Sequence, residues 1–110
     1  MLNIVSTPIG NLDDLSIRQA KTLATSDIIL AEDTRSAQTL LDAIKKRFML
    51  PVTCSMIWSY YKEKEFEKLP EIIDLLKLDK NISLISEAGT PLISDPGYLL
   101  VKTCLQKNIP

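Results

Sequence analysis

Short runs of apolar residues interrupt an otherwise polar chain, and each run has the length of a buried strand. Three of them lie at Leu2–Ser6, Asp27–Ala31 and Asn81–Ser86. A fourth stretch, Pro51–Ser59, also predicts a strand because it contains β-branched and aromatic residues. Strands covered on both faces have such apolar runs, so the pattern favours a parallel sheet.

Between these runs, apolar residues recur at every third or fourth position, which is the spacing of an amphipathic helix. The helical stretches are Asp13–Ser26, Ser36–Arg47, Tyr60–Leu78 and Tyr98–Gln106. Pro70 falls inside the third stretch, and proline removes a helical hydrogen bond unless it stands in a first turn. The sequence therefore predicts either a kink at Pro70 or the start of a second helix there.

The alternation of strand and helix, with short connections, predicts the fold class. It is typical of α/β proteins, in which helices flank a mostly parallel sheet, and we expect about four to five strands. The 110 residues have the size of one domain. The last predicted helix is followed by residues 107–110, which resemble a turn into a further strand. We therefore expect residues 1–110 to be truncated before a further strand.

The charge balance gives no sign of a nucleic-acid partner. The chain has 13 lysine and arginine residues and 14 aspartate and glutamate residues, so its formal net charge is −1. Proteins that bind nucleic acid usually present a basic face. On composition alone, such a face would have to come from further sequence or from a second subunit.

Reactive side chains are few. The chain has no histidine, and its only cysteines are Cys54 and Cys104, which excludes the usual zinc ligand sets. We expect no metal site, and we expect both thiols to be reduced and buried among apolar neighbours. The lack of histidine also removes the commonest general base.

The sequence carries no signal for export or membrane insertion. The N-terminal residues MLNIVSTP lack a basic region followed by a long apolar run. No apolar stretch approaches the ~20 residues that a membrane span requires. We therefore expect a cytoplasmic protein that makes no membrane contact.

Ligands of open parallel sheets bind at the carboxyl ends of the strands, and three loops follow such ends here. The first loop, Ser6–Asp14, reads STPIGNLDD. Pro8 stiffens it, and Gly10 permits the backbone to approach a ligand closely. The loop lacks the glycine pattern of a dinucleotide site and the lysine of a phosphate loop. An ordinary strand-to-helix turn is the alternative.

The second loop, Glu32–Arg35, reads EDTR. Glu32 or Asp33 can bind a hydroxyl or an exocyclic amine, and Arg35 can bind a phosphate through two hydrogen bonds. The alternative is structural, with Asp33 or Thr34 capping the next helix and Arg35 forming a surface ion pair. The residues alone favour neither interpretation.

The third loop, Ser86–Gly97, reads SEAGTPLISDPG and is the most unusual stretch of the chain. Its two glycines let the backbone approach a ligand, and its two prolines fix the path between them. A rigid loop of this kind suits an adenosine-like group bound through main-chain atoms. The alternative is a turn over Ser94–Gly97 that starts the last helix.

Together, the stretches TPIGNL, AEDTR and SEAGTPLISDPG resemble three motifs of the bacterial 16S rRNA ribose 2′-O-methyltransferases. These enzymes belong to the tetrapyrrole (corrin/porphyrin) methylase superfamily. The motifs occur in the same order with matching spacing, and they cover essentially the whole chain. The resemblance implies a two-domain homodimer that binds S-adenosylmethionine between its domains and methylates 16S rRNA in the small ribosomal subunit. Residues 1–110 would be its truncated N-terminal domain, without the fifth strand and the C-terminal domain.

The resemblance also implies roles for individual residues. Those that would contact the cofactor are Pro8, Ile9, Gly10, Ala88, Gly89, Thr90, Pro91 and Ile93. Glu32, Asp33 and Arg35 would face the substrate and form the catalytic group. One carboxylate would orient or deprotonate the ribose hydroxyl, and the guanidinium would hold a neighbouring phosphate. The protein's task in such a transfer is largely to position the reactants.

Two stretches depart from the family pattern. Glu87 stands where the family usually has aspartate, and Ser59–Lys64 replaces a histidine-containing S-Y-H-x-H-N stretch. The second departure bears on the identity of the RNA substrate rather than on cofactor use. Two other functions are compatible with the sequence. One is methylation of a tetrapyrrole or another small molecule, and the other is non-catalytic binding by a nucleotide-binding α/β module.

Overall fold

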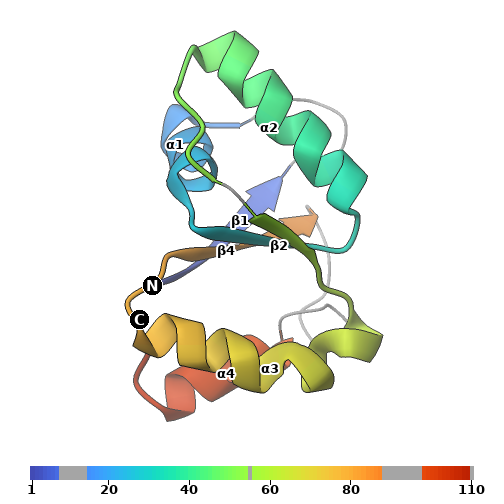
Figure 1. Cartoon of the computed structure of the whole chain (residues 1–110), viewed down its shortest axis with the longest axis vertical. Coiled ribbons are helices and arrows are strands. Elements are labelled where there is room, and N and C mark those ends of the chain that lie inside the picture. Colours follow the sequence, from blue (N-terminus) through green and yellow to red (C-terminus); the bar gives the residue numbers. More distant parts are fainter. Residues whose placement is uncertain (8–14, 55, 88–97, 110) are drawn as a thin grey trace.

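A computed structural model describes residues 1–7, 15–54, 56–87 and 98–109. These residues form a four-stranded parallel sheet with two helices against each face (Figure 1). The predicted α/β class is therefore confirmed. No helix among the described residues is long and apolar enough to cross a bilayer. The elements are β1 (Leu2–Thr7), α1 (Ile17–Thr25), β2 (Ile28–Ala31), α2 (Thr34–Phe48), β3 (Met56–Ser59), α3 (Lys62–Lys77), β4 (Ile82–Glu87) and α4 (Tyr98–Gln106).

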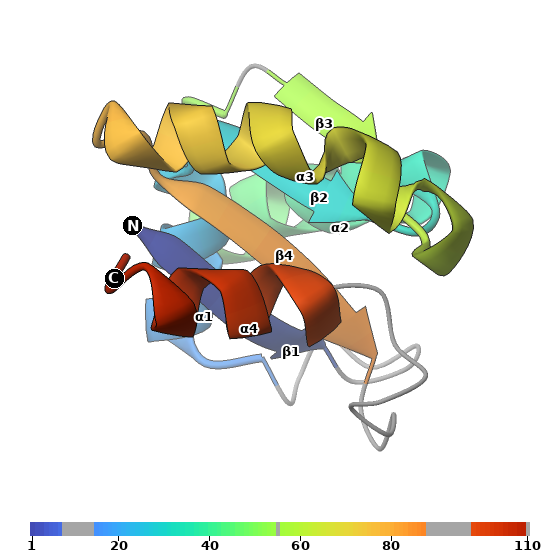
Figure 2. The same ribbon diagram turned by 90° about the horizontal axis from the view of Figure 1, so that it is seen from below.

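The strands do not lie in chain order. The order across the sheet is β1-β4-β2-β3, and Ile82 of β4 lies opposite both Leu2 of β1 and Ile28 of β2. Helices α1 and α2 cover one face, and α3 and α4 cover the other (Figures 1 and 2). The chain that leaves β2 therefore goes to the opposite face from the chain that leaves β4, its neighbour. Open α/β sheets bind ligands where adjacent connections diverge in this way.

Each face of the sheet packs against its helices through a separate apolar cluster. Along β2, Ile28 and Leu30 pack in the cluster that contains residues of α3 and α4. Ile29, between them, packs with Leu23 of α1 and Ile44 of α2. Successive side chains of a strand point to opposite faces, so a strand covered on both sides needs an apolar residue at every position. This explains the unbroken IILA run.

Strand β3 is shorter than the predicted Pro51–Ser59 and begins only at Met56. The backbone N–H groups of Thr53 and Cys54 donate to the carbonyl oxygen of Ala24 at 2.8 and 3.1 Å. These residues therefore satisfy a carbonyl at the end of α1 instead of pairing with β2. Strand propensity does not distinguish the two kinds of hydrogen bond, which is why the predicted strand was too long.

Helix α1 begins at Ile17, later than the predicted Asp13, because Ser16 caps it. The backbone N–H of Gln19 donates to Ser16 Oγ at 3.1 Å, and the backbone N–H of Ser16 donates to Gln19 Oε1 at 2.9 Å. This reciprocal pair is a capping box and fixes the start of the helix. Asp13 and Asp14 lie outside the described residues.

Helix α3 continues through Pro70 as one element. The predicted alternative, a second helix that starts at Pro70, is therefore wrong for this described part of the chain. Proline cannot donate the hydrogen bond that a helix interior requires. Ile72, Ile73 and Leu76, which follow it, are buried in the core cluster. Their packing offsets the missing bond, as tertiary contacts commonly do for marginal helices.

The two thiols differ in burial. Cys104 is buried in α4, as predicted, but Cys54 is only half-buried, so the prediction is wrong for this residue. The cause is its place beside β3, which lies at the edge of the described sheet, next to β2. Both cysteines are free, and burial raises the pKa of both thiols.

Candidate active site

The three predicted loops start at the carboxyl ends of parallel strands, so they all leave the same edge of the sheet. Thr7, the last residue of β1, lies opposite Glu87, the last residue of β4. The first and third loops therefore start side by side. The predicted cofactor residues of these loops, at positions 8–10, 88–91 and 93, lie outside the described residues. What the described residues show is that the two loops leave adjacent parallel strands at the same level.

The second loop follows β2, the other neighbour of β4, and here the side chains are described. Asp33 is the N-cap of α2, which begins at Thr34, two residues before the predicted start. Asp33 Oδ1 accepts the backbone N–H groups of Arg35 and Ser36 at 2.9 and 3.3 Å. Its other oxygen, Oδ2, accepts the hydroxyl of Ser36 at 3.1 Å. The capping interpretation is thus confirmed for Asp33, and Thr34 is the first helical residue.

The cap hydrogen bonds also hold Asp33 in its charged form. The backbone N–H groups of Ser36 and Arg35, followed by the Ser36 hydroxyl, lower the pKa of the Asp33 carboxyl. A general base must take up a proton near neutral pH, and efficiency falls when its pKa is far below that value. Asp33 is therefore better suited to hold the helix start than to accept a proton.

This cap has a testable pH dependence. Because the folded-state pKa of Asp33 is lowered, its stabilising contribution is present above the unfolded pKa and is lost as the pH falls through the folded pKa. An Asp33→Asn variant keeps a capping oxygen but does not titrate. We expect wild-type stability to fall relative to this variant from about pH 5 to pH 2, measured by urea unfolding at each pH. A stability difference that stays constant over this range would contradict the assignment.

Glu32 and Arg35 lie on either side of the cap, and both are exposed. Within the described ranges, no hydrogen bond or ion pair engages the Glu32 carboxylate, and the predicted surface ion pair of Arg35 is not formed. The loop therefore presents one unengaged carboxylate and one guanidinium beside the end of β2. Of the two carboxylates predicted to act on a hydroxyl, Glu32 is the more available.

A buried polar cluster near the same edge was not predicted. Tyr60, directly after β3, donates its hydroxyl to Glu65 Oε2 at 3.0 Å, and the backbone N–H of Leu100 donates to the same oxygen at 3.0 Å. All three residues are buried. The backbone N–H of Tyr60 also donates to the carbonyl of Ala31 at the end of β2, at 2.8 Å.

Glu65 thus caps α4 from a different helix. Leu100 stands in the first turn of α4, where backbone N–H groups lack partners within the helix and favour a negative charge. The cluster therefore ties the ends of β2 and β3 to the helix that follows the third loop. Burial and the negative charge of Glu65 raise the pKa of Tyr60, so its hydroxyl stays protonated and donates.

The helical spacing could have revealed Glu65. It lies four, seven and eleven residues before Leu69, Ile72 and Leu76, so it falls on the apolar stripe of α3. The alternating charges around it, KEKEFEK, suggest a solvated face and hide this position. A carboxylate on an apolar stripe is buried and needs a hydrogen-bonding partner. The position of Glu65 on this stripe could therefore have predicted a buried polar cluster.

The fold and this edge define a class of protein. It is a parallel α/β domain whose adjacent connections diverge and whose loops converge at the carboxyl ends of the strands, which is where such domains bind ligands. Comparison with known proteins gives the particular family. The model of the family of tetrapyrrole (corrin/porphyrin) methylases matches residues 1–110, and the chain belongs to this family.

Curated relatives from three bacteria match almost the whole chain, and each is named ribosomal RNA small subunit methyltransferase I. The chain is 45% identical over 108 residues to the relative from Thermotoga maritima and covers 46% of it. It is 40% identical over 109 residues to that from a Hydrogenobaculum species and covers 45%. It is 50% identical over 107 residues to that from Rickettsia prowazekii and covers 36%. These alignments include 98%, 99% and 97% of this chain, which therefore spans less than half the length of these relatives.

Proposed function

We propose that the protein is an S-adenosylmethionine-dependent methyltransferase that modifies a ribose 2′-hydroxyl of small-subunit rRNA. The observation that carries this proposal is 40–50% identity, over nearly the whole chain, to relatives named for methylation of that RNA. Membership of the methylase family supports the same reaction class. In this proposal the chain is the first of two domains of a homodimeric, cytoplasmic enzyme whose partner is the small ribosomal subunit.

The described residues are compatible with a cofactor held by the first and third loops. Their parent strands, β1 and β4, are adjacent and end in register at Thr7 and Glu87. Residues of both loops can therefore act on one ligand, and the proposed contacts are Pro8, Ile9, Gly10, Ala88, Gly89, Thr90, Pro91 and Ile93. When bound, S-adenosylmethionine supplies an electrophilic methyl group on a sulfonium, which is the demanding part of the chemistry.

The chain's own residues have positioning and proton-handling tasks. Glu32 orients the ribose hydroxyl and accepts its proton, because its carboxylate is exposed and unengaged within the described ranges. Asp33 holds the start of α2 and thereby fixes the loop that carries Glu32 and Arg35. Arg35 holds a neighbouring phosphate through charge-assisted hydrogen bonds. Correct placement of reactants alone accounts for a large part of such a rate enhancement.

The family also motivates a second candidate, methylation of a tetrapyrrole or another small molecule. One assay separates the two. The full-length protein is incubated with radiolabelled S-adenosylmethionine, unmodified small ribosomal subunits and, separately, a panel of tetrapyrroles. We expect label in the small-subunit rRNA, at a ribose that resists alkaline cleavage of the adjacent phosphodiester bond. Label only in a small molecule would support the second candidate, and label in neither would overturn both.

A further inference from the structure

The two helical layers differ in charge, although the chain as a whole is almost neutral. Helices α1 and α2 together contain six basic residues and one acidic residue, whereas α3 and α4 contain five of each. The basic residues of the first layer are all exposed: Arg18, Lys21, Arg35, Lys45, Lys46 and Arg47. The overall charge of −1 therefore conceals a basic layer, and a basic face need not come from another subunit.

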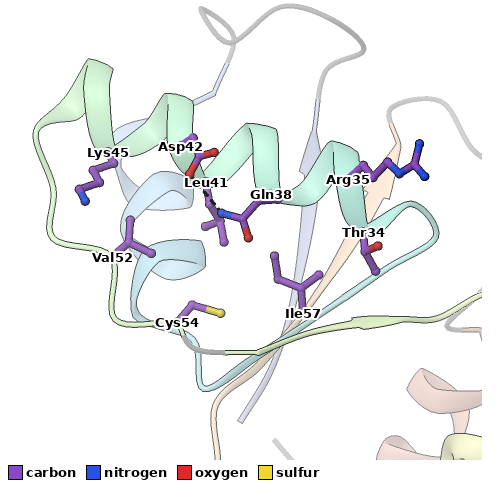
Figure 3. Close-up of a pocket in the computed structure, with 9 residues that line it drawn as sticks. All are labelled: Thr34, Arg35, Gln38, Leu41, Asp42, Lys45, Val52, Cys54 and Ile57. Carbon is purple, nitrogen blue, oxygen red and sulfur yellow. Dashed lines mark hydrogen bonds between the residues drawn. The ribbon is translucent and has the colours of Figure 1, made fainter.

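A groove runs along this layer, between α2 and the edge strand β3 (Figure 3). Its volume is about 570 Å³, within the range of sites that take small organic ligands. Five polar residues of α2 line it, namely Thr34, Arg35, Gln38, Asp42 and Lys45. The last four follow one another at three, four and three residues, which places them along one side of the helix. The apolar part of the lining is contributed by Leu41, Val52, Cys54 and Ile57.

The charges in the groove are ordered along its length. Arg35 lies in the first turn of α2 and Lys45 in the last, so the two cations stand at opposite ends. Lys45 is ten positions after Arg35 in the helix, which corresponds to about 15 Å along the axis. Between them, Gln38 Nε2 donates to Asp42 Oδ1 at 3.1 Å (Figure 3). The groove thus has cationic ends, a hydrogen-bonding middle and an apolar lining.

We propose that this groove binds a single-stranded segment of RNA, and this inference rests on the proposed function. A span of about 15 Å is covered by several nucleotides, because phosphates of one strand repeat every ~3.4 Å along a duplex axis. Phosphates contact Arg35 and Lys45 at the two ends. A base or ribose between them contacts the Gln38–Asp42 pair and the apolar lining. Single strands expose the base faces and edges that such a surface needs, whereas a duplex hides them.

Asp42 determines where along the groove phosphates can bind. Its negative charge disfavours a phosphate in the middle, so the backbone is held at the ends and the donor groups of a base or sugar face the carboxylate. The end at Arg35 adjoins Glu32, the carboxylate that acts on the ribose hydroxyl in the proposed function. The groove would then hold the RNA next to the nucleotide that is modified.

The test measures binding of a labelled, mixed-sequence, single-stranded 20-nucleotide RNA to the full-length protein at several salt concentrations. Lys45→Ala is expected to weaken binding about fourfold near 0.15 M salt and to reduce the slope of log affinity against log salt by about 0.7. Lys77→Ala is the matched control, because Lys77 is exposed in the last turn of α3 on the other layer. It should leave both quantities unchanged. Unfolding curves are recorded for every variant.

The outcomes separate this proposal from the proposed function, because methyl transfer to small subunits is measured on the same preparations. Equal RNA binding by wild type and Lys45→Ala would overturn the proposal that the groove binds RNA. A loss of binding in Lys77→Ala as large as that in Lys45→Ala would overturn it too. If the wild type transfers no methyl group, the proposed function fails. The comparison of RNA binding by Lys45→Ala and Lys77→Ala then still decides whether the groove binds RNA.

Discussion

Replacing Glu65 with alanine should lower the free energy of unfolding by about 3 kcal/mol. The side chain is only 5% exposed, and its Oε2 accepts hydrogen bonds from the Tyr60 hydroxyl and from the backbone N–H of Leu100. Alanine would leave both donors buried without this acceptor, and each unsatisfied buried group costs about 1–3 kcal/mol. Urea unfolding followed by circular dichroism measures the loss.

Three further variants make the prediction specific. Glu65→Gln keeps an accepting oxygen and should cost less than the alanine variant. Tyr60→Phe removes one donor and leaves Leu100 paired, so we expect a loss of about 1 kcal/mol. Glu67→Ala is the matched control, since Glu67 is exposed on the same helix and should change stability by less than about 0.5 kcal/mol. Equal stabilities of Glu65→Ala and Glu67→Ala would refute a structural role for the buried cluster.

Replacing Glu32 with glutamine should slow methyl transfer by about a hundredfold or more, the range in which a general base contributes. The amide keeps the size of the side chain and can still orient a hydroxyl, but it cannot take up a proton. Single-turnover rates at saturating cofactor and small subunits isolate the transfer step. The dissociation constants for cofactor and RNA should change little, because the amide can still contact the ribose hydroxyl and the other proposed contacts to cofactor and RNA lie elsewhere.

Two controls accompany the Glu32 variant. Glu71→Gln removes an exposed carboxylate from α3, remote from the carboxyl edge of the sheet, and should transfer at the wild-type rate. Asp33→Asn should also retain most activity, because asparagine caps helices well and the lowered pKa of Asp33 makes it a poor base. A full rate in Glu32→Gln together with a large loss in Asp33→Asn would reverse the assignment of the two carboxylates.

Most elements of this fold were predictable from the sequence, but their arrangement was not. The IILA run and the helical periodicity of Ser36–Arg47 correspond closely to β2 and α2, because local pattern reports how each segment is buried. The order β1-β4-β2-β3 depends on pairings between distant segments, such as Leu2 with Ile82. No local pattern encodes which strand inserts between two others.

The site was predictable to a similar extent. The sequence places Glu32, Asp33 and Arg35 at the end of a strand, but it leaves open whether Asp33 caps the helix or acts on a ligand. Only the observed hydrogen bonds from Arg35 and Ser36 decide that question. Glu65 was missed because alternating charges mask its apolar stripe. The basic layer was missed because acidic residues elsewhere cancel it in the total charge.

The pairing of β1 with β4 sets the order in which this protein can fold during translation. Among the described residues, β1 pairs only with β4, and Leu2 and Ile82 are 80 positions apart. At about 5–20 residues per second, the ribosome needs about 4–16 s to synthesise that interval. Strand β1 therefore leaves the ribosome well before β4, the strand with which it pairs. During that time its apolar residues are available to chaperones, and β2 and β3 can already have paired.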